Sequence, residues 1–92
     1  QNVERDFAFI LPKSIKANDI VNKIKKIDKK IINKVSIFDV YEGQKIDENL
    51  KSVAIRVLLQ PLEKTFSDEE IESFSNQIID LIITGFKASL RK

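Results

Sequence analysis

The stretch 51–61, KSVAIRVLLQP, decides the fold because its side chains alternate in character along the chain. One set is uniformly aliphatic and consists of Val53, Ile55, Val57 and Leu59. The other set mixes small residues with one guanidinium and consists of Ser52, Ala54, Arg56, Leu58 and Gln60. Alternation with a period of two is typical of a strand with one buried face. We therefore expect a central strand whose aliphatic set packs into a core and whose other face is a platform for a ligand.

Two further segments carry the same alternation. Residues 5–11, RDFAFIL, predict a first strand with Phe7, Phe9 and Leu11 on its bulky face. Pro12 ends this strand, because proline donates no ladder hydrogen bond. Residues 86–91 predict a short final strand, since apolar and polar residues alternate there as well.

Residues 35–41, VSIFDVY, predict another strand because they are rich in β-branched and aromatic residues. Its faces are ambiguous, since Ile37 and Phe38 are adjacent and both apolar. If Phe38 and Val40 point inward, Asp39 and Tyr41 share the open face with Ile37. A β-bulge would change that assignment. The polar residues 42–49 predict a loop that leads back to the central strand.

Two segments carry helical periodicity instead. From residue 17 to about residue 30 an apolar stripe is formed by Ile20, Val21, Ile24, Ile27 and Ile31. The second helix begins with a capping box, in which Ser67 caps the amides near Glu70 and Glu70 reaches back. Its apolar side is formed by Ile71, Phe74, Ile78, Ile79 and Ile82. Gly85 is expected to end it, because glycine readily adopts the left-handed conformation.

The order β-α-β-β-α-β predicts an α+β fold, the ferredoxin-like sandwich. Right-handed crossovers place both helices on one face of a four-stranded antiparallel sheet. The expected strand order is fourth, first, third, second, so residues 5–11 and 51–61 lie side by side in the middle. The chain of 92 residues suffices for one domain. We expect that domain to span residues 1–92, with residues 1–4 as the remnant of a linker.

Composition excludes several kinds of site. The chain has no cysteine and no histidine, which removes disulfides, thiolate metal sites and the commonest general base. No apolar run approaches the roughly 18 residues that span a membrane. The net charge is only +2, yet residues 13–34 contain eight lysines against two aspartates. This asymmetry favours a polyanionic partner, and a merely solvated helix face is the competing interpretation.

The outward residues of the predicted sheet indicate a binding surface. They are Asp6, Ala8, Asp39, Tyr41, Ser52, Ala54, Arg56 and Arg91. Small residues let a flat group approach the backbone, Tyr41 offers a stacking surface and the arginines offer planar donors, which suits single-stranded bases. The competing interpretation is an ordinary solvated sheet in which Asp6 pairs with Arg56 or Arg91. Catalysis is not expected, because a whole strand should separate Asp6 from Asp39, giving about 10 Å.

Five short motifs follow one another along the chain: RDFAF at 5–9, IFDVYEG at 37–43, KSVAIRVLLQP at 51–61, KTFSDEEI at 64–71 and GFKASLR at 85–91. In this order and spacing they resemble the ferredoxin-fold anticodon-binding domain at the C-terminus of the β chain of bacterial-type phenylalanine–tRNA ligase. The resemblance covers about residues 5–91. It implies that the chain binds the anticodon stem-loop of tRNA-Phe and is not itself catalytic.

The resemblance also implies site residues and partners. The family's motifs match this sequence at Arg5, Asp6, Asp39, Tyr41, Ser52, Ala54, Arg56 and Arg91, which are the RNA-binding residues it implies. No cofactor or metal is implied for this segment. The complete enzyme is implied to use ATP and magnesium, to join a catalytic α chain in an (αβ)2 heterotetramer, and to be cytoplasmic with no membrane partner. The lysine-rich first helix is more basic than the family pattern.

A different class remains as the alternative. Ferredoxin-like domains also occur as small-molecule-sensing or protein-docking modules within regulatory chains. A glycine-rich first loop would favour that class, and this chain has none.

Overall fold

The order of strands and helices matches the order predicted from the sequence. The computed structural model describes residues 2–62 and 65–91 of the 92-residue chain. Along the chain it contains β1 (Val3–Pro12), α1 (Ala17–Lys25), β2 (Ile32–Tyr41), β3 (Leu50–Leu59), α2 (Asp68–Phe86) and β4 (Ser89–Leu90). The predicted α+β ferredoxin-like fold is thereby confirmed.

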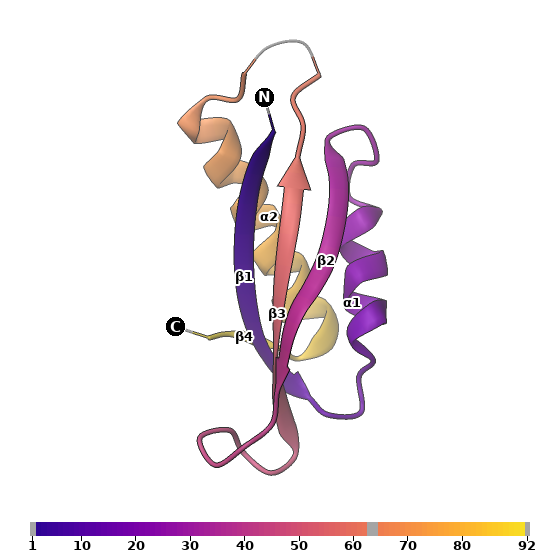
Figure 1. The fold of residues 1–92 in the computed structure, drawn as a ribbon, viewed down its shortest axis with the longest axis vertical. Helices are drawn as coiled ribbons and strands as arrows, with labels where there is room; N and C mark the ends of the chain where they lie inside the picture. The colour runs from indigo at the N-terminus through magenta and orange to yellow at the C-terminus, as the bar shows by residue number, and fades with distance from the viewer. Residues whose placement is uncertain (1, 63–64, 92) are drawn as a thin grey trace.

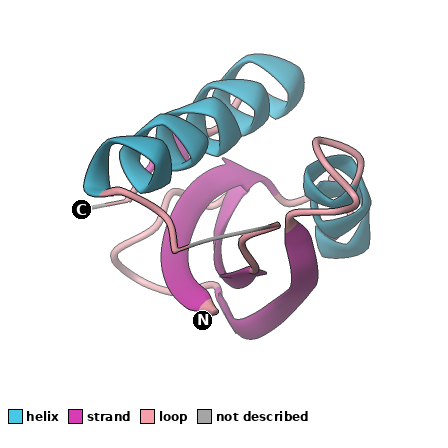
Figure 2. Cartoon of the chain, turned by 90° about the horizontal axis from the view of Figure 1, so that it is seen from above, coloured by secondary structure: helices cyan, strands magenta, loops and turns pink. Residues whose placement is uncertain are grey.

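The strands form one antiparallel sheet in the order β2-β3-β1-β4. β1 and β3 occupy the centre, as expected, and β4 pairs only with Phe9 and Ile10 of β1. Both helices lie on the same side of the sheet: α2 behind β1 and β3, and α1 beside β2 (Figure 1). The end-on view shows the opposite side of the sheet without a helix (Figure 2). No helix among residues 2–62 and 65–91 is long and apolar enough to cross a membrane.

The predicted inward set of β3 forms the centre of the core. The residues Val53, Ile55, Val57 and Leu59 are completely buried. They share one apolar cluster with fully buried isoleucines of the two helices, Ile20, Ile24, Ile78 and Ile82. Antiparallel pairing sets Ile55 opposite both Phe7 of β1 and Ile37 of β2. Directly paired residues project from the same face of a sheet, so the three side chains face the helices together.

A bulge in β2 corrects the predicted faces of that strand. Ile37 pairs with Ile55 and Asp39 pairs with Ala54, which leaves Phe38 between them without a partner. Ile37 therefore faces the core and does not share the open face with Asp39. One extra residue in one strand reverses the alternation beyond it, and the simple period of two does not hold across this point.

The same bulge contradicts the prediction that Phe38 points inward, whereas Val40 does project inward as predicted. Phe38 lies on the helix-free side with 51% of its surface exposed, and the Arg56 guanidinium lies over its ring. Val40 pairs with Val53 and so projects to the helix side. It remains 49% exposed there, which shows that the helices do not cover the end of the sheet near Val40.

Helix α1 ends at Lys25, well before the predicted end near residue 30. The Asp28 carboxylate accepts the backbone N–H groups of Lys30 at 2.9 Å and Ile31 at 3.1 Å. Such side-chain acceptors compete with the helical hydrogen bonds, and the chain turns toward β2. Ile27 and Ile31 still pack against the core, so the apolar stripe is continued by a turn.

Helix α2 begins as predicted and ends later. Ser67 Oγ accepts the backbone N–H of Glu70 at 3.1 Å, and Glu70 Oε1 accepts the N–H of Ser67 at 2.8 Å. At the other end the left-handed residue is Lys87, with φ 54° and ψ 40°, and Gly85 is helical. Phe86 packs against the core as part of the helix, which carries the helix beyond the glycine.

The two terminal strands also differ in length from the prediction. Val3 and Glu4, which the sequence assigns to the linker remnant, belong to β1 and pair with Leu59 and Leu58. The final strand holds two residues instead of the whole segment 86–91. The Arg91 backbone N–H extends its contact with β1 by donating to a carbonyl, that of Ala8, at 2.7 Å.

The substitution Ile55→Ala tests the central position of this residue. Because Ile55 is completely buried, we expect a cavity that lowers the free energy of unfolding by about 2–5 kcal/mol, measured by urea denaturation. The control is Val40→Ala on the same side of the sheet, where the half-exposed side chain should cost only about 0.5 kcal/mol. Equal losses in the two variants would contradict the proposed centre of the core.

Candidate nucleic-acid interface

The side of the sheet that faces away from the helices is called the open face here. Strand pairing assigns its members, because Asp6 pairs with Arg56, Ala8 and Asp39 both pair with Ala54, and Tyr41 pairs with Ser52. Arg91 reaches the same side by donating from Nη1 to Ser52 Oγ at 3.1 Å. The structure thus brings together all eight outward residues predicted from the sequence: Asp6, Ala8, Asp39, Tyr41, Ser52, Ala54, Arg56 and Arg91.

Arg5 is the one implied RNA-binding residue that lies elsewhere. It pairs with Val57, a core residue, and so projects to the helix side of the sheet. Its Nη1 donates to the carbonyl oxygen of Glu4 at 2.8 Å. Arg5 also borders a hollow whose other walls come from α2, including Asp68 and Glu72. Its surroundings are therefore acidic and separate from the open face.

A bidentate ion pair occupies the centre of the open face. Arg56 Nε donates to Asp6 Oδ1 at 2.9 Å, and Arg56 Nη2 donates to Asp6 Oδ2 at 3.0 Å. The Glu4 carboxylate lies 3.7 Å from the same Nε. The guanidinium carbon of Arg56 also lies 4.8 Å from the centre of the Phe38 ring. One guanidinium is thus held over an aromatic ring by a carboxylate on the neighbouring strand.

This ion pair shifts the titration of both partners. Hydrogen bonds from Arg56, assisted by its positive charge, lower the pKa of the Asp6 carboxyl below its ordinary value. The same bonds raise the pKa of Arg56. Both side chains are more than 40% exposed, at 45% for Asp6 and 43% for Arg56. Solvent therefore screens the pair, and its contribution to folding stability is small.

A second arginine–aromatic pair lies further along the sheet. The guanidinium carbon of Arg91 is 5.5 Å from the centre of the Tyr41 ring. These two side chains cover Ser52, which is only 3% exposed although it belongs to the open face. The backbone expected to be bare at Ser52 is therefore not exposed in this structure. At Ala54 the surface is half-buried.

Gly43 lets the Tyr41 ring adopt its position. A Cβ atom added at Gly43 would lie 2.6 Å from Tyr41 Cζ, far inside van der Waals contact. Any other residue at position 43 would therefore push the ring away from the place where it meets Arg91. Gly43, in the loop after β2, thus leaves the space that the Arg91–Tyr41 pair requires.

Phe38 is the open-face residue that the sequence pattern does not identify. Its exposure and its contact with Arg56 make it comparable to Tyr41 as a flat surface. The signal that was available is the adjacent pair Ile37–Phe38, since two neighbouring apolar residues cannot both face the core of an unbroken strand. The strand bulge resolves this conflict by sending one residue to each side.

The open face offers groups that suit recognition of a ligand. Within this part of the chain no group of three or more acidic side chains is placed to hold a metal ion. Asp6 and Asp39 lie on β1 and β2, which β3 separates. What the open face provides is two planar cations, two aromatic rings and a few hydrogen-bonding groups on a shallow surface.

Comparison with known proteins agrees with this geometry. Residues 1–91 match the family model described as ferredoxin-fold anticodon binding domain. The chain is similar to proteins named phenylalanine–tRNA ligase beta subunit: it is 46% identical to that of Nitrobacter winogradskyi and 51% identical to that of Bradyrhizobium diazoefficiens, each over 91 residues and 99% of this chain. It is 51% identical to the Zymomonas mobilis protein over 79 residues, 86% of this chain. The chain spans only about a tenth of the length of these curated relatives, 11% of the first two.

The pKa of Asp6 gives a direct test of the central ion pair. A folded-state pKa below the unfolded value of about 3.9 means that the pair stabilises the fold above about pH 4, and that this contribution is lost as pH falls through the folded pKa. We expect Arg56→Gln to raise the pKa of Asp6 toward its ordinary value, measured by NMR titration of the side-chain carboxyl carbon. The control is Arg5→Gln, which should leave the Asp6 titration unchanged, because Arg5 projects to the helix side of the sheet, away from Asp6.

Proposed function

This chain belongs to the ferredoxin-fold anticodon-binding domain family, and from that premise we propose that its open face binds the anticodon stem-loop of a tRNA, in particular tRNA-Phe. The bases of a loop are unpaired and present flat faces and hydrogen-bonding edges. Proteins recognise such bases by stacking them on aromatic rings or guanidinium planes and by bonding to their edges. The open face carries both kinds of group on adjacent strands.

The observation that carries the proposal is the pair of arginine–aromatic stacks. Arg56 lies over Phe38 and Arg91 lies over Tyr41, at 4.8 and 5.5 Å from the ring centres. Phe38 is 51% and Tyr41 37% exposed, so each ring keeps a large uncovered area. Exposed aromatic side chains of this size on a surface without a covering helix are typical of an interaction site. Their neighbouring cations favour a ligand that is both aromatic and anionic.

The Asp6–Arg56 pair supports a role in orienting the guanidinium. A bidentate carboxylate fixes the plane of the arginine, and its three remaining N–H groups, two on Nη1 and one on Nη2, can donate to a ligand. Arg56 in this orientation offers donors to a base edge or a phosphate beside the Phe38 ring. Asp6 is thus proposed as a positioning residue for Arg56. The same ion pair would also form on an ordinary solvated sheet, so its presence is compatible with a binding surface.

The second pair supports recognition that is coupled to movement. Arg91 holds Ser52 covered in the free chain through its hydrogen bond of 3.1 Å. When Arg91 turns toward a phosphate, the Ser52 hydroxyl and the Tyr41 ring become accessible together. Asp39 lies beside this region at its pairing position opposite Ala54 and is proposed to accept a hydrogen bond from a base amino group.

The role of this chain within a larger enzyme is proposed from the names of its relatives. We place this chain as the RNA-recognition module of a phenylalanine–tRNA ligase β subunit, which works in the cytoplasm with a catalytic α subunit. ATP and magnesium would serve the joining of phenylalanine to tRNA elsewhere in that assembly. This module would contribute affinity and orientation for the tRNA.

The substitution Arg56→Ala tests the planar donor. We expect it to weaken binding of a tRNA-Phe anticodon stem-loop by roughly 1–3 kcal/mol, as for loss of a bidentate base contact. Arg56→Lys keeps the charge and loses the fork, so it should recover only part of the affinity. Binding is measured by fluorescence anisotropy at fixed salt. Unchanged affinity for Arg56→Ala at unchanged stability would remove Arg56 from the site.

The substitution Phe38→Ala tests the ring that the bulge exposes. Loss of one base-stacking surface should weaken stem-loop binding by about 1–3 kcal/mol. Val40→Ala is the matched control, because Val40 is equally exposed two residues along the same strand and projects to the other side of the sheet. If the two variants lose the same affinity, the open face is not the RNA-binding side and a protein-docking or small-molecule-sensing role gains support.

A further inference from the structure

Seven lysines gather around α1 and the turn that follows it. We call them the basic flank: Lys16, Lys23, Lys25, Lys26, Lys29, Lys30 and Lys34. All seven are exposed. Asp19 and Asp28 are the acidic residues within the same span. The Asp28 carboxylate accepts two backbone N–H groups, and the two aspartates offset only two of the seven positive charges, which leaves a local net charge of +5.

The lysines of the basic flank make no ion pair within residues 2–62 and 65–91. The buried side of α1 is formed by Ile20, Val21 and Ile24, which pack into the core. The large apolar side chains that are exposed in the described part of the chain lie outside α1. The outer surface of α1 is therefore cationic and polar.

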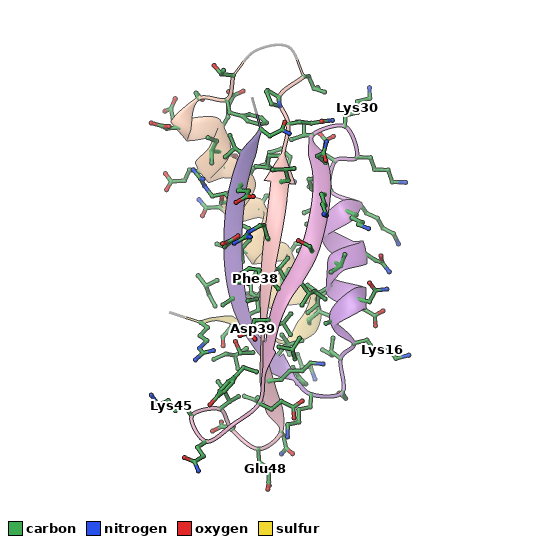
Figure 3. All side chains as sticks on the ribbon, viewed as in Figure 1. Lys16, Lys30, Phe38, Asp39, Lys45 and Glu48 are labelled. Atoms are coloured by element: carbon green, nitrogen blue, oxygen red, sulfur yellow. The ribbon has the colours of Figure 1, made fainter. Side chains whose placement is uncertain are left out.

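The basic flank borders the open face. Among the strands, α1 packs mainly against β2, the edge strand that carries Phe38, Asp39 and Tyr41. Figure 3 views the molecule from the open face and shows Lys16 and Lys30 near the two ends of α1, beside the strand on which Phe38 and Asp39 lie. Lys34 belongs to β2 itself and pairs with Leu58. The positive charge thus runs from the sheet around the β2 edge to the helix.

We infer that the basic flank binds the phosphate backbone of the stem of the same RNA whose loop bases lie on the open face. Lysine is a mobile point charge without the planar fork of arginine, and such contacts position nucleic acids without reading sequence. From residue 16 to residue 26 the helix rises about 15 Å, enough to follow several phosphates of one strand. This inference rests on the proposed function and adds to it a second surface with a different ligand group.

The test compares two RNA hairpins that share the anticodon loop and differ in stem length. In the unchanged chain, the longer stem should bind more tightly and with a steeper dependence of log K on log salt concentration. The triple variant Lys23→Gln, Lys26→Gln, Lys30→Gln should lose this gain. Each lost phosphate contact lowers the slope by about 0.7–0.9, so the slope should fall by about 2 and the affinity at about 0.1 M salt by roughly 10- to 100-fold.

The control triple is Lys13→Gln, Lys45→Gln, Lys87→Gln, which removes the same net charge away from the basic flank. It should lower the slope far less than the flank triple. Equal effects of the two triples would overturn the inference, because the lysines would then act only through net charge. So would a flank triple that keeps the full gain from the longer stem.

Two further measurements separate this inference from the proposed function. A duplex that lacks the loop removes the bases that the open face is proposed to bind: if the duplex binds as tightly as the hairpin, the proposed function fails. Vesicles of anionic lipid test the other source of phosphate groups, and flank-dependent binding to vesicles that matches binding to the long hairpin would overturn the assignment to RNA. Circular dichroism of both triples checks that α1 is intact.

Discussion

The covering of only one side of the sheet is the constraint on which the other features depend. The aliphatic side chains of β3 are completely buried beneath both helices, and this burial supplies most of the driving force that a chain of this size has available. Two helices are enough to cover one side of a four-stranded sheet. The other side must then satisfy its polar groups and limit its apolar surface without help from a helix.

The open face meets that requirement with its own side chains. Asp6 and Arg56 bond to each other, and Arg91 bonds to Ser52 while it lies over Tyr41. These contacts hold two flexible arginine side chains near defined orientations before any ligand is present. Ordering such side chains in advance lowers the entropy cost of binding. The open face therefore satisfies its own polar groups and also presents hydrogen-bond donors that are already oriented for a ligand.

Most of the architecture follows from the alternation of β3 and β1 and from the capping box of α2. Those patterns are local, because each involves residues only a few positions apart in the sequence. The bulge at Phe38, the early end of α1 and the left-handed Lys87 depend on competition between alternatives. The Asp28 turn competes with another helical turn, and the packing of Phe86 competes with the tendency of Gly85 to end a helix.

The site divides in the same way. Tyr41, Ser52 and Arg56 share the open face because they sit at regular positions of paired strands. Arg5 is adjacent to Asp6 in sequence and for that reason projects to the opposite side. The covering of Ser52 by Arg91 joins residues 39 positions apart, and no local pattern encodes such a contact. The side of the sheet on which these side chains lie thus follows from the sequence, whereas the contacts between them do not.

The short β4 has a consequence for how this chain meets other copies of itself. Because β4 pairs only with Phe9 and Ile10, the outer edge of β1 before Phe7 has no neighbouring strand within the described residues. An edge of this kind invites the strand of another molecule. Here it bears three consecutive charged residues, Glu4, Arg5 and Asp6. Alternating charges disfavour in-register stacking of identical edges on energetic grounds, so the chain protects its own backbone against fibre-like assembly.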